Sequence, residues 1–111
     1  MDKQLSSILS LCKKAGMLKT GDFAAEKALR AKEAKLIIIA DDASDNTKKK
    51  FVNKTFYYKT PVYIYGCISD LSHVTGVVNR AVFAVTDCGF AANIEKKLKD
   101  ANITEAGEWR K

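Results

Sequence analysis

The chain has little of the chemistry that most enzymes and metal proteins require. Its 111 residues include one histidine and one proline, and the three cysteines form no Cys-x-x-Cys pair. A zinc site needs several such ligands close together, so no metal is expected. The sequence also has no P-loop, no dinucleotide fingerprint and no nucleophile spaced with a base. We therefore expect a non-enzymatic protein with no catalytic residues and no cofactor.

Long apolar runs are missing as well. No run approaches the roughly 20 residues of a membrane span, and the first residues have no apolar signal-peptide core. Cys12, Cys67 and Cys88 are odd in number and lie in apolar surroundings, which indicates buried, reduced thiols. These features predict a cytoplasmic protein that does not act at a membrane.

Positive charge is what the chain has in excess. Nineteen Lys and Arg against thirteen Asp and Glu give a net charge of +6, with a pI of about 9.3. The hydrophobic fraction of 47% is ordinary for a globular domain, and the length suits one domain with its own core. The charge favours a polyanionic partner, although basicity that serves solubility alone is the alternative.

Apolar periodicity predicts helices that alternate with strands. Helices are expected over 5–15, from 21 to about 30, after 45, over 69–74 with Ser69 as N-cap, and over 87–99; strands are expected over 17–20, 35–40, 62–65 and 81–85. The third helix should bury Phe51, Val52, Thr55 and Phe56. Such alternation implies an α/β layered sandwich. Residues 1–100 form a single predicted domain, and 101–111 form a C-terminal tail that contains Trp109.

The most informative motif is the stretch Lys19-Thr20-Gly21-Asp22-Phe23-Ala24-Ala25-Glu26-Lys27. Here a glycine opens a helix, with lysines before it and further into it. Free backbone N–H groups and the positive end of the helix dipole suit an anion at such a position. In a basic chain without a catalytic cluster, we expect that anion to be an RNA backbone. Phe23 is either a core residue or an exposed platform for an unpaired base.

Five motifs, in this order, carry a resemblance to a known family. They are Leu9-x-x-Cys12-x-Lys14-Ala15-Gly16, Gly21-x-x-x-x-x-Lys27, the segment 34–47 (Ala-Lys-Leu-Ile-Ile-Ile-Ala-x-Asp-Ala-Ser-x-Asn-Thr), Lys59-x-Pro61 and the segment 84–91 (Ala-Val-Thr-Asp-x-Gly-Phe-Ala). From about residue 5 to residue 98 the chain resembles the superfamily of ribosomal proteins L7Ae and L30e, and within it the bacterial YlxQ-like branch. The resemblance implies a three-layer α-β-α sandwich with a four-stranded mixed sheet, and binding of kink-turn RNA.

The family reads sheared G·A pairs with a Gly-x-Asn-Glu-x-x-Lys helix start, and this chain matches that pattern in part. Gly21 and Lys27 agree with it, whereas Phe23 and Ala24 stand in place of the asparagine and glutamate. Neither replacement can hydrogen-bond to a base edge, so Phe23 would exchange base-edge readout for stacking. Val77 likewise replaces a lysine that is common in the YlxQ-like branch.

The resemblance and the charge pattern together predict one RNA-binding rim made of three segments, around 21–27, 44–48 and 77–80. The residues expected there are Lys19, Thr20, Gly21, Phe23, Lys27, Ser44, Lys48, Val77, Val78 and Arg80. The cations would neutralise phosphates, and the loop at 77–78 would give a displaced base an apolar rest. The expected partner is structured RNA, with ribosomal proteins as further candidates and no DNA.

Three alternatives remain open at this point. The chain could bind structured RNA without kink-turn specificity, or it could be a protein–protein module on the same fold. A magnesium-dependent phospho-acceptor is a weaker third possibility, because Asp41 and Asp42 follow a buried strand. The strand that ends at Tyr65, however, is followed by Gly66 and Cys67 instead of an acceptor aspartate. Asp42 is therefore better interpreted as a residue that orders its loop.

Overall fold

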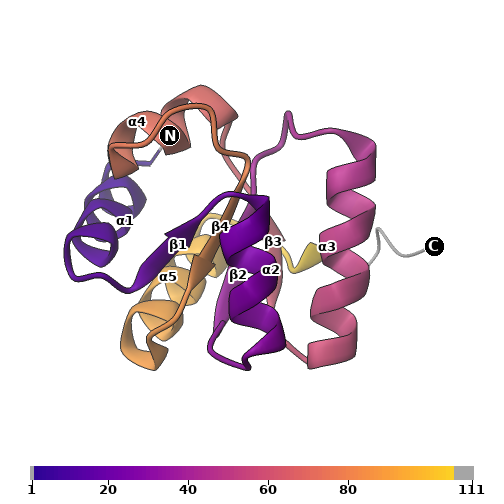
Figure 1. Ribbon diagram of the computed structural model, residues 1–111. Coiled ribbons are helices and arrows are strands. Elements are labelled where there is room, and N and C mark those ends of the chain that lie inside the picture. Colours follow the sequence, from indigo (N-terminus) through magenta and orange to yellow (C-terminus); the bar gives the residue numbers. More distant parts are fainter. Residues whose placement is uncertain (1, 107–111) are drawn as a thin grey trace.

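The computed structural model describes residues 2–106 (Figure 1). The elements in chain order are α1 (Lys3–Lys14), β1 (Leu18–Thr20), α2 (Asp22–Arg30), β2 (Leu36–Ile39), α3 (Asp45–Tyr58), β3 (Val62–Ile64), α4 (Ile68–Thr75), β4 (Val82–Val85) and α5 (Cys88–Asp100). The predicted alternation of helices and strands is confirmed.

The four strands form one mixed sheet in the order β1-β4-β2-β3. β4 pairs antiparallel with both β1 and β2, whereas β2 and β3 run parallel. All residues of β2 and β4 are buried, because both strands are central and both faces of the sheet are covered. β1 is an edge strand of the sheet, as expected for a short extended segment.

Two hydrophobic cores lie on opposite faces of the sheet and define three layers. Leu36 and Ile38 point to a core shared with α1, α4 and α5, whereas Ile37 and Ile39 point to a core shared with α2 and α3. This alternation follows from the period of two along a strand. In Figure 1 the first set of helices lies to the left and behind the sheet, and α3 lies to the right. The predicted α-β-α sandwich is confirmed.

The buried face of α3 differs from the prediction at two residues. Phe56 is 63% exposed, whereas Lys48 is only 9% exposed. With 3.6 residues per turn, Lys48, Phe51, Val52 and Thr55 stand at spacings of 0, 3, 4 and 7 and form one stripe. Phe56 falls outside that stripe. The expectation that Phe56 is buried is therefore wrong, and the stem of Lys48 takes a core-facing position.

α4 begins one residue earlier than predicted, and its cap comes from a distant loop. Cys67 is the N-cap residue and provides no side-chain cap. Instead the backbone N–H of Ile68 donates to Asp42 Oδ1 at 2.8 Å. Ser69 is thus not the N-cap, because the carboxylate of Asp42 already satisfies the first turn. Asp42 therefore caps a helix 26 residues away, and the expectation that its carboxylate orders its own loop is corrected.

The cysteines and the last described segment complete the fold. All three cysteines are free, but only Cys12 is buried; Cys67 is half-buried and Cys88 is exposed as the first residue of α5. The prediction of three buried thiols is therefore wrong for Cys88. After α5, Ile103 packs on one core and Ala106 is buried in the other. Trp109 of the predicted tail lies outside the described residues.

Two further findings concern the described part of the chain. No helix in residues 2–106 is both long and apolar enough to cross a membrane. Nor do these residues contain a group of three or more His, Cys, Asp or Glu side chains that could hold a metal ion.

Candidate nucleic-acid interface

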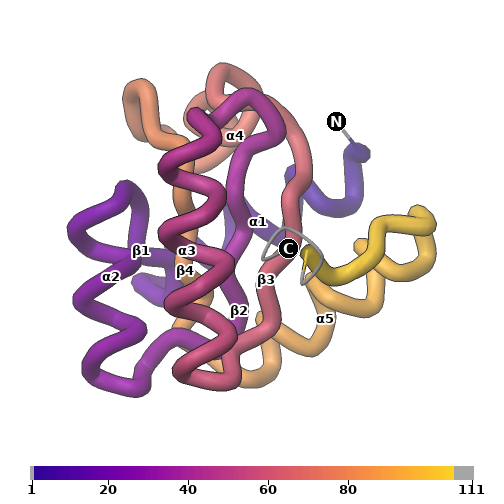
Figure 2. The backbone as a smooth tube through the Cα atoms, turned by 90° about the vertical axis from the view of Figure 1, so that its right-hand side faces the viewer, coloured from indigo at the N-terminus to yellow at the C-terminus, as the bar shows by residue number. Residues whose placement is uncertain are grey.

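The starts of the three predicted segments lie at one end of the sheet, which we call the N-terminal pole because α2 and α3 both begin there (Figures 1 and 2). Lys27 does not lie at this pole, because it belongs to the last turn of α2. Backbone hydrogen bonds join the segments to the start of β4. The N–H of Gly21 donates to the carbonyl of Val82 at 2.7 Å, and the N–H of Ala40 donates to that of Ala81 at 2.8 Å. The residues that directly follow β1 and β2 are therefore hydrogen-bonded to the two residues that follow Arg80.

Gly21 adopts a backbone conformation that other residues avoid. Its φ of 96° and ψ of 161° lie in a region that is essentially restricted to glycine. This conformation turns β1 directly into α2, whose first turn receives no side-chain cap. A Cβ atom at this position would lie 3.2 Å from Nη1 of Arg80 and 3.3 Å from its Cδ. Gly21 is therefore required by the turn, and a side chain at this position would also make the Arg80 side chain shift by a few tenths of an ångström.

Arg80 is held in place by α4. Ser72 Oγ accepts from the N–H of Arg80 at 2.9 Å and donates to its carbonyl at 3.1 Å. Ser72 was not predicted as a site residue. Its role could have been inferred from one feature: Ser72 is a polar residue on the buried face of a short helix, where its hydroxyl requires a hydrogen-bond partner.

Positive charge from two sources meets at Gly21. The Arg80 guanidinium lies beside the start of α2, where the helix dipole is already positive. The ion pairs among residues 2–106 join Glu26 to Lys50 and to Lys54, so Arg80 takes part in neither. Negative charge is also present at this pole: Asp22 lies in the first turn of α2 and Asp45 in the first turn of α3, and Asp41 and Asp42 are exposed in the loop before α3. An anion that met both the guanidinium and the free N–H groups would relieve the remaining positive potential.

Two exposed apolar side chains flank this cationic centre. Phe23 is 79% exposed and Val78 is 84% exposed, the two largest values for big apolar side chains among the described residues. Phe23 lies two residues after Gly21, and Val78 lies two residues before Arg80. The alternative that Phe23 belongs to the core is wrong. Val77, in contrast, is half-buried and packs on the core.

The remaining predicted site residues differ in their solvent exposure. Lys19 and Lys27 are exposed, and Thr20 is half-buried in β1. Ser44 is exposed and serves as the N-cap of α3, where its hydroxyl accepts from the N–H of Thr47 at 3.1 Å. Lys48 is brought to the same pole, but its burial disfavours an open phosphate contact.

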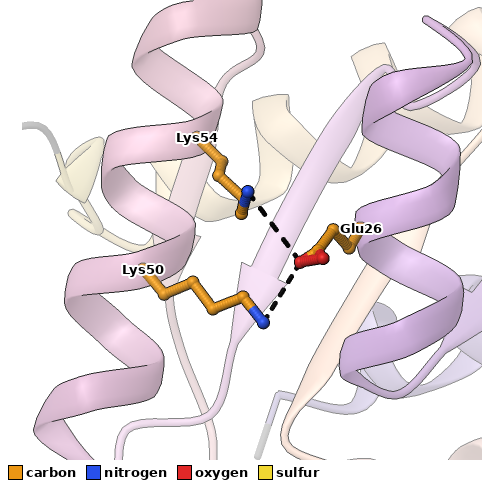
Figure 3. A network of polar contacts seen from close by, with 3 residues as sticks. All are labelled: Glu26, Lys50 and Lys54. Carbon is orange, nitrogen blue, oxygen red and sulfur yellow. Dashed lines mark ion pairs between the residues drawn. The ribbon is translucent and has the colours of Figure 1, made fainter.

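An ion-pair cluster joins α2 to α3 midway along the two helices (Figure 3). Glu26 Oε2 lies 3.1 Å from Lys50 Nζ and 3.9 Å from Lys54 Nζ. The hydrogen bond from Lys50 lowers the pKa of the Glu26 carboxyl, so the group is charged at neutral pH. Part of the positive charge of α3 is therefore neutralised inside the protein.

This fold and this basic pole define a class of protein. The chain belongs to the ribosomal protein L7Ae/L30e/S12e/Gadd45 family, whose model matches residues 3–101. It is 35% identical over 94 residues to the RNA-binding protein YlxQ of Enterococcus faecium, a match that covers 85% of this chain and 86% of that one. It is 38% identical over 84 residues to the RNA-binding protein YlxQ of Bacillus subtilis strain 168, with 76% and 84% covered. The chain is thus similar to YlxQ proteins over most of its length.

Solved structures agree with this assignment. A protein of unknown function from Bacillus halodurans C superposes with a TM-score of 0.85 at 31% identity, covering 88% of this chain and 99% of that one. A Giardia lamblia 15.5kD RNA binding protein superposes with a TM-score of 0.73 at 20% identity, covering 90% and 92%. At that identity the second match shows a shared fold.

Proposed function

We propose that the protein is a non-enzymatic RNA-binding protein that takes structured, kink-turn-like RNA at its N-terminal pole, as part of a ribonucleoprotein. The observation that carries this proposal is the placement of Arg80 over Gly21, at the uncapped start of α2. The names of the YlxQ relatives, which describe them as RNA-binding proteins, support the choice of RNA as the anion.

Each exposed residue at the pole has a role in this binding. Arg80 and Lys19 neutralise backbone phosphates at the pole, and the free N–H groups of α2 approach one phosphate directly. Lys27, in the last turn of α2, neutralises a phosphate only where the RNA continues along that helix. Phe23 and Val78 present apolar surface to a base that has left its helix. Stacking of this kind is worth roughly 1–3 kcal/mol per base and tolerates any sequence.

The exposure of Phe23 favours a second candidate, an RNA binder without kink-turn specificity. A stacked phenylalanine reads no base edge, so sheared pairs would not be distinguished by hydrogen bonds at this position. The protein would then select RNAs by an unpaired base and by backbone shape.

Gel-shift titrations at two salt concentrations test both candidates. We expect a kink-turn RNA to bind more tightly than a straight duplex, and Arg80→Ala to lower that affinity about ten-fold or more, since charge-assisted contacts are strong. Lys99→Ala serves as the control, because Lys99 is exposed on α5 in the opposite layer. Equal and weak binding of both RNAs would contradict RNA recognition. If only the Phe23→Asn/Ala24→Glu double variant discriminates between them, the second candidate is correct.

A further inference from the structure

A second basic surface lies at the opposite end of α2 and α3, away from the N-terminal pole. The C-terminal ends of both helices lie side by side at the lower edge of Figures 1 and 2. A hollow of about 270 Å³ opens between them and is lined by Lys32, Lys35 and Lys59. All three lysines are exposed, and the described lining of this hollow contains no acidic side chain. We call this end the C-terminal pole.

Both helices end in the same backbone motif at this pole. The N–H of Glu33 donates to the carbonyl of Ala28 at 2.9 Å, and the N–H of Thr60 donates to that of Thr55 at 2.8 Å. This six-to-one hydrogen bond is typical of a Schellman motif, in which the residue before the donor is left-handed and is usually glycine.

Lysine occupies the left-handed position in both motifs. Lys32 has a φ of 59° and Lys59 a φ of 58°. The other two non-glycine residues with positive φ in the described chain are asparagines, Asn79 and Asn102, which tolerate this conformation better. Glycine would relieve the backbone at both positions, so each lysine side chain either complements the negative end of its helix or contacts a partner. Both side chains line the same hollow.

Aromatic surface adjoins the lysines. A neighbouring hollow of about 540 Å³ shares Lys59 and Pro61 with the first and is lined by Phe56 and Tyr57. Tyr57 is 77% exposed, yet its ring is positioned by Tyr58, whose ring stands at 89° to it with centroids 4.9 Å apart. An aromatic ring that is both exposed and held in place suits stacking with a flat partner.

We propose that the C-terminal pole is a second nucleic-acid contact, which binds single-stranded RNA. The three lysines neutralise successive phosphates, while Tyr57 and Phe56 offer surface to unpaired bases. Duplex RNA does not fit this arrangement, because its bases are already stacked on one another. Glu105, the acidic residue at the aromatic hollow, does not line the lysine hollow. This contact goes beyond the proposed function, which uses only the N-terminal pole.

The direct test uses oligouridine and oligoadenine of about ten nucleotides, within the usual range of site sizes. Fluorescence anisotropy should show Lys32→Gly/Lys59→Gly binding both at least about ten-fold more weakly than the natural protein. Its log–log salt slope should be smaller by about 1.4, that is 0.7 for each lost phosphate contact. Tyr57→Ala should also weaken binding about ten-fold. Lys96→Ala/Lys99→Ala removes the same charge from exposed positions on α5 and should leave affinity nearly unchanged.

Thermal unfolding of the same variants separates a binding role from a structural one. Lys32→Gly/Lys59→Gly should unfold at the same temperature as the natural protein or a few degrees higher, because glycine suits left-handed positions. A lower unfolding temperature would mean that the lysines stabilise the helix ends, and would overturn the inference. Unchanged oligonucleotide binding would overturn it too.

The N-terminal pole provides the last control. If Arg80→Ala abolishes oligonucleotide binding and the lysine pair has no effect, single strands bind at the N-terminal pole and the second contact does not exist. If Lys32→Gly/Lys59→Gly weakens oligonucleotide binding but the natural protein does not bind structured RNA, the second contact is supported and the proposed function is contradicted. The two conclusions can therefore be told apart.

Discussion

At the scale of single residues, Gly21 shows how one position can serve both folding and binding. Its backbone conformation is required for β1 to enter α2 without a linker, and the missing side chain leaves room for Arg80. The sequence alone predicts a glycine turn here. It cannot reveal Arg80 above the turn, since that contact depends on Ser72 of α4 and on the pairing of β4 with β1.

The conformation of Gly21 predicts an unusual response to asparagine. Asparagine tolerates the left-handed helical region but not the region that Gly21 occupies. Gly21→Asn should therefore lower the free energy of unfolding by about 1–3 kcal/mol, as measured by urea denaturation. Gly76→Asn is the matched control, because Gly76 has φ 72° and ψ 27° and no neighbouring atom within 4 Å of a built Cβ. Equal losses for the two variants would contradict this account of Gly21.

Cys12 predicts a loss of stability at alkaline pH. Burial, with a smaller contribution from the charge of Asp87, raises the pKa of this thiol from 9.0 to about 11. The unfolded chain therefore releases the proton first, so the stabilising difference is complete below pH 9 and is lost as the pH rises to about 11. Urea unfolding at pH 8 and pH 10.5 should show a smaller decrease for Cys12→Ala than for the natural protein. An identical decrease would contradict the raised pKa.

At the scale of elements, Glu26 joins α2 and α3 and also limits the positive charge of α3. Replacing it by glutamine removes the ion pairs to Lys50 and Lys54, which are partly exposed. The free energy of unfolding should fall by less than about 1 kcal/mol. Structured RNA should bind more tightly, with a steeper salt dependence, because two cations midway along α3 are released from their ion pairs.

The control for this prediction is Glu33→Gln, which removes an exposed carboxylate after the end of α2. Both variants add the same net charge. If both raise the RNA affinity equally in anisotropy titrations, net charge and not the released lysine pair is responsible.

The helices and strands were largely predictable, and the two failures have different physical origins. The unbroken apolar run of β2 indicated a strand buried on both faces, which is correct. On α3, the spacing i, i+1, i+4 and i+5 predicts that Phe56 is buried together with Phe51, Val52 and Thr55, but the centre of the buried stripe is rotated around the helix axis toward Lys48. That rotation turns Phe56 outward and Lys48 inward. The cap that Asp42 gives to α4 joins residues 26 apart, so no local pattern predicts it.

At the scale of the whole molecule, the basic charge is divided between two ends of the α2–α3 layer. α2 has nine residues and therefore separates the poles by about 14 Å. This distance exceeds the Debye length of about 8 Å at physiological ionic strength. Cations at the two poles should therefore act on different parts of a bound RNA, with little direct influence on each other.

This separation predicts additive effects on an RNA that carries a kink-turn and a single-stranded extension of about ten nucleotides. Arg80→Ala removes a cation from one pole and Lys59→Gly removes one from the other. The binding free energy lost by the double variant should equal the sum of the single losses within about 0.5 kcal/mol, because distant sites with no shared partner are independent. Without the extension, Lys59→Gly should have almost no effect while Arg80→Ala keeps its full effect. A coupling above about 1 kcal/mol would instead place both residues at one continuous RNA site.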